Sequence, residues 1–280
     1  MAEAGAKVMR GDEFYVGYLA KAPAGVARHV RRAVLGLALL MVAGAVAVTI
    51  AQGPFGRGSW GNAPKKMTGV LKLAPYPLLL VGAGPGEGTR TVLLVNAGKC
   101  GLFSAGGYCG PVRDESGKDV VVQRRAALAP LDGRLVEVTG TVLERDGRVM
   151  VELSAAEASI AATGSDLPGG VPVDDGPASS VAVRGRIIDP KCYLGAMKPG
   201  DGKVHRACAI RCIAGGIPPV LLGEGGSAGR FYLLTGAQGE PLNDRVLGYV
   251  DDAVEVRGVL STIGDMEVLA VASDGVVRVR

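Results

Sequence analysis

The chain has 280 residues, of which 48% are hydrophobic and 21% charged, and this balance excludes a disordered or collagen-like protein. Its 44 glycines and an aromatic content of only 4% favour short strands joined by turns, around a core of Val, Leu, Ala and Ile. The formal net charge is +4, and six cations against three anions lie before residue 33, so the remaining chain is almost neutral. We therefore expect no nucleic-acid partner.

One segment near the N terminus is apolar enough to cross a bilayer. Residues 33–51 (AVLGLALLMVAGAVAVTIA) carry no charge over nineteen positions. At about 1.5 Å per residue they reach roughly 28 Å, close to the ~30 Å hydrocarbon core of a membrane. Arg28, Arg31 and Arg32 precede them and predict a cytoplasmic N terminus with an extracytoplasmic C-terminal body. We interpret the segment as an uncleaved single-pass transmembrane helix; a cleaved signal peptide, whose apolar run usually has about 7–15 residues, is the alternative.

The segments on either side of this helix differ in character. Residues 1–32 form a cytoplasmic or interfacial N-terminal segment, in which Phe14, Tyr15 and Tyr18 would suit the membrane surface. A loose tail and a docking handle for a membrane partner are the alternatives. Residues 52–66 are turn-rich and polar, and they predict a tether.

A strand-rich module, residues 67–154, follows the tether. Short apolar runs typical of strands occupy residues 76–81, 91–95 and 135–142. Asp146 and Gly147 separate two further runs and are a strong hairpin signal. Residues 155–180 lose strand character and predict a linker, which leaves residues 181–280 as a second module.

The second module repeats the plan of the first. VEVTG (136–140) recurs as VEVRG (254–258), TVLLVNAG (91–98) is echoed by FYLLTGAQG (231–239), and TGVL (68–71) by RGRII (184–188). Duplication explains this repeat, although small barrels can share such patterns by chance. The predicted fold is mainly β, an N-terminal transmembrane helix followed by two small OB-like barrels in tandem, and a β-sandwich is the alternative for each module.

Two of the five cysteines, Cys100 and Cys109, bracket a glycine-rich loop in the first module with eight residues between them. A disulfide there is expected if the body lies outside the cytosol. In the chain-entropy model such a bridge contributes about 2–3 kcal/mol.

The other three cysteines lie near a histidine in the second module, within DPKCYLGAMKPGDGKVHRACAIRCIAGGIPP (189–219). Cys192, His205, Cys208 and Cys212 could complete a tetrahedral shell for a soft transition metal (zinc, copper or iron). His205, Cys208 and Cys212 share one face if the segment is helical. A disulfide from Cys192 to Cys208 or Cys212 is the alternative, and five cysteines leave at least one unpaired.

The insertion is also rich in cations, namely Lys191, Lys198, Lys203, Arg206 and Arg211. Cations near a thiol favour its thiolate form, which suits metal binding, redox exchange or an anionic ligand. A solvated loop with scattered charges is the alternative.

Residues 184–271 contain four motifs in a fixed order: G-x-I-x-D-x-x-C, H-x-x-C-A-x-x-C-I-x-G-G-I-P, Y-L-L-x-G and V-x-V-x-G. In this order the segment resembles largely uncharacterised bacterial exported or membrane-anchored OB-like proteins. The resemblance implies an extracytoplasmic setting at the bacterial inner (cytoplasmic) membrane. It also implies a shared site at Cys192, His205, Cys208 and Cys212. It implies no reaction, and nothing transfers to the first module beyond the barrel.

Three functions follow from these patterns. The first is an accessory or binding protein, a metal-binding subunit or assembly factor of a membrane redox complex, with no catalytic residue of its own. The second is a thiol–disulfide enzyme that uses Cys208 and Cys212. The third is a disulfide-stapled structural module that presents a surface to a partner.

Overall fold

The protein is described here from a computed structural model, over residues 23–51, 58–82, 88–164, 179–227 and 229–279. The chain divides into two compact units, Met1–Phe55 and Gly56–Arg280, and each is treated by itself. Most of the expected interfacial segment, part of the tether and most of the linker lie outside the described residues.

The first unit contains helix α1 (Ala24–Ala51), which begins nine residues before the expected apolar segment. Its most apolar window has a mean hydropathy of 2.5, and none of its side chains is buried. The hydroxyl of Thr49 donates to the carbonyl of Ala45 at 2.8 Å, so its hydrogen bond is made within the helix. α1 is long and apolar enough to cross a membrane, a property that anchors and signal sequences share.

The second unit begins with a closed five-stranded barrel. Its strands are β2 (Lys65–Lys72), β3 (Leu78–Gly82), β4 (Thr89–Val95), β5 (Leu135–Arg145) and β6 (Arg148–Leu153). They close in the order β2-β3-β4-β6-β5, and β4 pairs with β6 in parallel. Two short strands, β1 (Ser59–Trp60) and β7 (Ile160–Ala162), pair with β5, and helix α2 (Val120–Leu128) connects β4 to β5.

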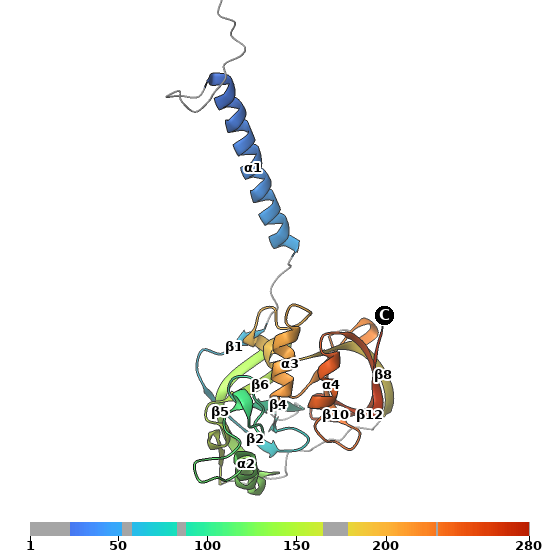
Figure 1. Ribbon diagram of the computed structural model, residues 1–280. Helices are drawn as coiled ribbons and strands as arrows, with labels where there is room; N and C mark the ends of the chain where they lie inside the picture. Colours follow the sequence, from blue (N-terminus) through green and yellow to red (C-terminus); the bar gives the residue numbers. More distant parts are fainter. Residues whose placement is uncertain (1–22, 52–57, 83–87, 165–178, 228, 280) are drawn as a thin grey trace, which may run out of the picture. The chain divides into compact units, whose positions relative to one another are not determined.

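A second closed barrel follows. Its strands are β8 (Ser179–Ile188), β9 (Val220–Gly223), β10 (Phe231–Gly236), β11 (Ala253–Ile263) and β12 (Met266–Arg278). They close in the order β8-β9-β10-β12-β11, with β10 parallel to β12, so both barrels have the same topology. Helix α3 (Arg206–Ala214) connects β8 to β9, and α4 (Asn243–Val246) connects β10 to β11 (Figure 1). The predicted fold is confirmed, and the sandwich alternative is excluded.

The sequence echoes fall on equivalent strands of the two barrels. VEVTG lies on β5 and VEVRG on β11, the fourth strand of each barrel. Gly140 and Gly258 end these motifs, and a Cβ at either position would collide with the backbone carbonyl of Glu152 or Ala270 on the neighbouring strand. The shared glycine thus marks one close strand approach that both barrels make.

The hairpin predicted at Asp146 and Gly147 is confirmed between β5 and β6. Both residues have positive φ, 50° and 78°, as a two-residue hairpin turn of the primed type requires.

The two barrels share an apolar cluster. The first barrel contributes side chains such as Leu80 and Met150, and the second contributes Phe231. Cys192 and Cys212 belong to the same cluster. Two of the three free thiols therefore lie in the interface between the barrels.

Candidate functional site

The long insertion between β8 and β9 positions the cysteines and the histidine. After β8 the chain makes one helical turn, η4 (Cys192–Ala196), whose first residue is Cys192. His205 stands at the N-cap position of α3 without a capping hydrogen bond from its side chain. Cys208 and Cys212 lie four residues apart on that helix, hence on one face. Along the chain the insertion thus consists of a cysteine at a helical turn, a loop, a short helix and a turn that leads into β9.

Three thiols converge in this insertion. The Sγ atoms of Cys192, Cys208 and Cys212 lie within 4.8 Å of one another. All three cysteines are free; Cys192 and Cys212 are buried and Cys208 is half-buried. In a tetrahedral site with metal–sulfur bonds of about 2.3 Å the sulfurs stand about 3.8 Å apart, so this group could hold a metal ion after small side-chain adjustments.

The fourth predicted ligand, His205, is grouped differently. Ligand atoms of His205, Asp189 and Cys192 lie within 4.8 Å of one another, and all three residues are buried. The four predicted residues, together with Asp189, thus form two overlapping groups of three that share Cys192. Asp189 was not among the predicted ligands, although its position three residues before Cys192 was visible in the sequence motif.

Two polar atoms of the Asp189 group are buried without a partner. Within the described part of the chain, neither Asp189 Oδ2 nor His205 Nε2 makes a hydrogen bond. The other carboxylate oxygen, Oδ1, accepts the backbone N–H of Lys191 at 2.9 Å. An unpaired buried polar group costs roughly 1–3 kcal/mol, so these two atoms mark a place where a further partner would stabilise the protein.

The surroundings of Cys192 also change the pKa of its thiol. A hydrogen bond with Cys212, burial and the charge of Asp189 together raise the pKa of Cys192 above its ordinary value. Without a cation, Cys192 is therefore a thiol at neutral pH. A metal that binds there must displace its proton.

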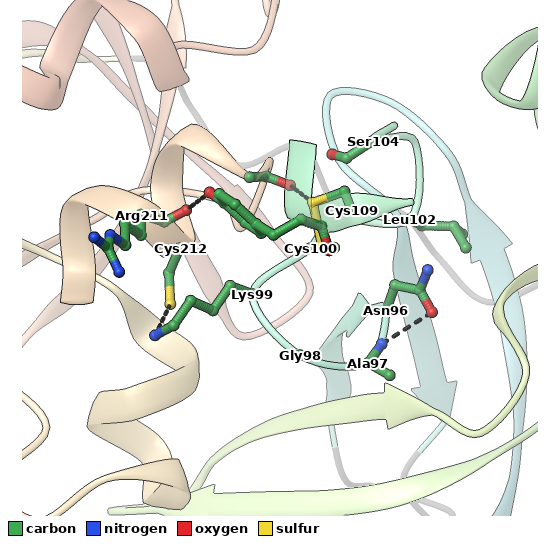
Figure 2. Close-up of a disulfide and its surroundings, with 12 residues drawn as sticks. Asn96, Ala97, Gly98, Lys99, Cys100, Leu102, Ser104, Cys109, Arg211 and Cys212 are labelled. Carbon is green, nitrogen blue, oxygen red and sulfur yellow. Dashed lines mark hydrogen bonds between the residues drawn. A yellow bond between two sulfur atoms is a disulfide. The ribbon is translucent and has the colours of Figure 1, made fainter. Parts of the chain in front are cut away.

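A lysine of the first barrel reaches the thiols of the second. Lys99 Nζ lies 2.6 Å from Cys208 Sγ and 3.7 Å from Cys212 Sγ, and Figure 2 shows its side chain extending toward Cys212. The hydrogen bond to Cys208 raises the pKa of Lys99, so its ammonium keeps its charge beside the sulfurs. Sequence reasoning missed Lys99 because it lies 109 residues from Cys208.

Lys99 directly precedes a disulfide. Cys100 and Cys109 are bridged with an S–S distance of 2.09 Å and a Cα–Cα distance of 5.6 Å (Figure 2). The bridged loop rests on the C-terminal end of α3, where the N–H of Gly101 donates to the carbonyl of Gly215 at 2.8 Å. The hydroxyl of Tyr108 donates to the carbonyl of Arg211 in α3. The disulfide loop therefore holds Lys99 against the cysteine helix.

A second lysine joins the same loop to the insertion. The side chain of Lys191 is 3% exposed and forms an ion pair with Glu152 of β6, a contact without hydrogen-bond geometry. Lys191 Nζ also donates to the carbonyls of Asn96 and Gly98, at 3.0 and 2.6 Å. This cation is thus buried between the barrels rather than part of a solvated loop.

Comparisons with protein-family models, with curated proteins and with solved structures found no match to this chain. The resemblance to bacterial exported OB-like proteins therefore gains no family assignment. The two barrels and the Cys/Asp/His cluster are established by the structure alone.

Proposed function

We propose that this chain is a membrane-anchored, extracytoplasmic accessory protein that binds a soft transition metal through Cys192, Cys208 and Cys212. The observation that carries the proposal is the convergence of three free thiols within 4.8 Å. Thiolate ligands suit zinc, copper(I) and iron, and three of them leave one coordination position open. His205 as the occupant of that position stays a prediction.

The surroundings of the thiols favour a metal over a disulfide among them. Any pairing of Cys192, Cys208 and Cys212 would leave one thiol over, whereas a metal uses all three. A trithiolate centre also carries excess negative charge, which the ammonium of Lys99 is placed to offset. The position of Lys99 follows from the packing of the disulfide loop on α3.

The setting of the protein is part of the proposal. A disulfide in the body is typical of an oxidising compartment, and α1 would hold that body at the outer face of the bacterial inner membrane. A metal site on a tethered, almost neutral body suits a subunit or assembly factor of a membrane complex, such as a redox complex. The partners would be the lipid bilayer and that complex.

Metal content tests the proposal directly. We expect at least one metal ion per chain in full-length protein purified in detergent, measured by elemental analysis beside a free-thiol count. Cys208→Ser should abolish metal binding by the three cysteines. Ala207→Ser, at an exposed neighbouring position on the same helix, should leave metal binding unchanged. Retention of every bound metal in Cys208→Ser and Cys212→Ser would refute the trithiolate site.

A thiol–disulfide enzyme is the second candidate, and one contact favours it. Cys208 is the half-buried thiol of the three, and Lys99 Nζ lies 2.6 Å from its sulfur. As a thiolate it could attack a disulfide of a partner protein to form a mixed disulfide. Cys212 would then displace the partner's reduced thiol and leave a Cys208–Cys212 bridge. Fast alkylation of Cys208 in metal-free protein, with a reversible two-electron couple, would favour this function.

A further inference from the structure

A group of donors that the proposed trithiolate site does not use lies directly beside it. It consists of the Asp189 carboxylate, the Cys192 thiol and the His205 imidazole, with ligand atoms within 4.8 Å of one another. Asp189 is fully buried, and Cys192 and His205 are 4% and 5% exposed. Asp189 directly follows β8, Cys192 begins η4 and His205 stands at the N-cap position of α3, so three different parts of the backbone bring these residues together.

The hydrogen bonding of this group is incomplete on two sides. Asp189 Oδ2 and His205 Nε2 are both buried without a hydrogen-bond partner among the residues that the structure describes. Lys191, the cation nearest to Asp189 in sequence, is committed to Glu152 and to two carbonyls of the first barrel. A cation between the carboxylate and the imidazole would satisfy both orphan atoms at once.

The chemistry of the three donors selects the kind of cation. Carboxylate, imidazole and thiolate together are ligands of zinc and similar borderline divalent metals, and a hard cation such as Mg²⁺ would not choose this set. Cys192 also belongs to the trithiolate group, and a thiolate sulfur that binds one metal keeps lone pairs with which it can bind a second.

We propose that Asp189, Cys192 and His205 form a second metal subsite, selective for zinc-like divalent cations and joined to the trithiolate site through a bridging Cys192. The inference rests on the proposed function only in sharing this sulfur. It assigns His205 to the second metal rather than to the first. On binding, the Cys192 proton is released to solvent and no electron is transferred.

Zinc stoichiometry tests the inference in the full-length chain in detergent. Reduced, metal-stripped protein is loaded with Zn²⁺ alone, desalted and measured by elemental analysis. We expect two zinc ions in the native chain and one in Asp189→Asn, in His205→Gln and in Cys208→Ser. Cys192→Ser should lose both.

Two variants serve as matched controls. Asp251→Asn changes another buried carboxylate whose Oδ2 has no partner among the described residues, and His29→Gln removes the other histidine of the chain. Both should keep two zinc ions. Thermal unfolding of each metal-free variant identifies any that fails to fold, and the Asp189 and His205 variants provide independent tests of the subsite.

The outcomes separate this inference from the proposed function. A single zinc that is lost in Cys208→Ser but kept in Asp189→Asn and His205→Gln would overturn the second subsite and leave the trithiolate site standing. A single zinc that His205→Gln and Cys208→Ser each remove would mean one four-ligand centre and would also overturn it. A single zinc lost only in the Asp189 and His205 variants would support the subsite and refute the trithiolate site. No zinc in the native chain would overturn the second subsite and exclude zinc as the metal of the trithiolate site.

Discussion

Replacing Lys191 by methionine should destabilise the body strongly, because the ammonium lies buried between the barrels. Its side chain is 3% exposed and that of its ion-pair partner Glu152 is 16% exposed. The variant leaves the Glu152 carboxylate and the carbonyls of Asn96 and Gly98 without their cation. Removing one partner of a buried ion pair typically costs about 3–5 kcal/mol.

Urea unfolding of the full-length chain in detergent, followed by the tryptophan and tyrosine signals, measures this cost. Because the barrels share an apolar cluster, we expect one transition for the body. With a slope of about 2–3 kcal/mol per M, a loss of about 3–5 kcal/mol should lower the midpoint by about 1–2.5 M. Lys66→Met is the matched control, since Lys66 and its partner Glu137 are 70% and 38% exposed and such a pair is worth about 0–1 kcal/mol.

A double variant tests whether the loss comes from the pair itself. In Lys191→Met with Glu152→Gln no carboxylate is left behind, so the combined loss should be clearly smaller than the two single losses added together. If Lys191→Met shifts the midpoint no further than Lys66→Met does, the lysine is solvated and the argument for a fixed interface between the barrels fails.

Three further changes have defined outcomes. Replacing Cys100 and Cys109 by serine should lower the free energy of unfolding by about 2–3 kcal/mol, and the same change in the presence of a reductant should cost nothing further. Lys99→Met, compared with Lys118→Met at an exposed position, should weaken zinc binding in a competition titration with a chelator, because the charge beside the two sulfurs is lost; equal affinities would contradict this role. Burial raises the pKa of Asp251, so the folded state holds that proton to higher pH than the unfolded state, and stability should fall as pH rises through the raised value. Asp251→Asn should therefore unfold at higher urea than the native chain at pH 7 and at a similar concentration at pH 3, whereas a lower midpoint at pH 7 would refute the sign.

Local signals in the sequence were enough to predict the fold. The turn at Asp146 and Gly147 and the repeated VEVxG strand each depend on residues close together in the chain, so their patterns carry the information. The spacing of Cys208 and Cys212 is also local, and the helix that would place both on one face is present as α3.

The contacts that complete the site could not be predicted in this way. Lys99 belongs to a loop of the other barrel, and its meeting with Cys208 depends on how two folded barrels pack. His205 has the helical spacing of a fourth ligand, yet it stands at the N-cap position of α3 and its ligand atom groups with those of Asp189 and Cys192. Helical periodicity predicts which side chains share a face within a helix, but the direction of a side chain at the N-cap position also depends on the loop before the helix.

The positions of the two insertions show what the first barrel contributes to the site in the second. The first barrel carries its disulfide loop after its third strand, and the second carries its cysteine insertion after its first strand. Although the barrels have the same topology, the insertions arise at different places and meet in the shared interface, where Gly101 bonds to Gly215. The second barrel alone would keep every proposed ligand. It would lack Lys99 beside the sulfurs and would expose Lys191 without Glu152. The first barrel is therefore the structural support of the site rather than a second copy of it.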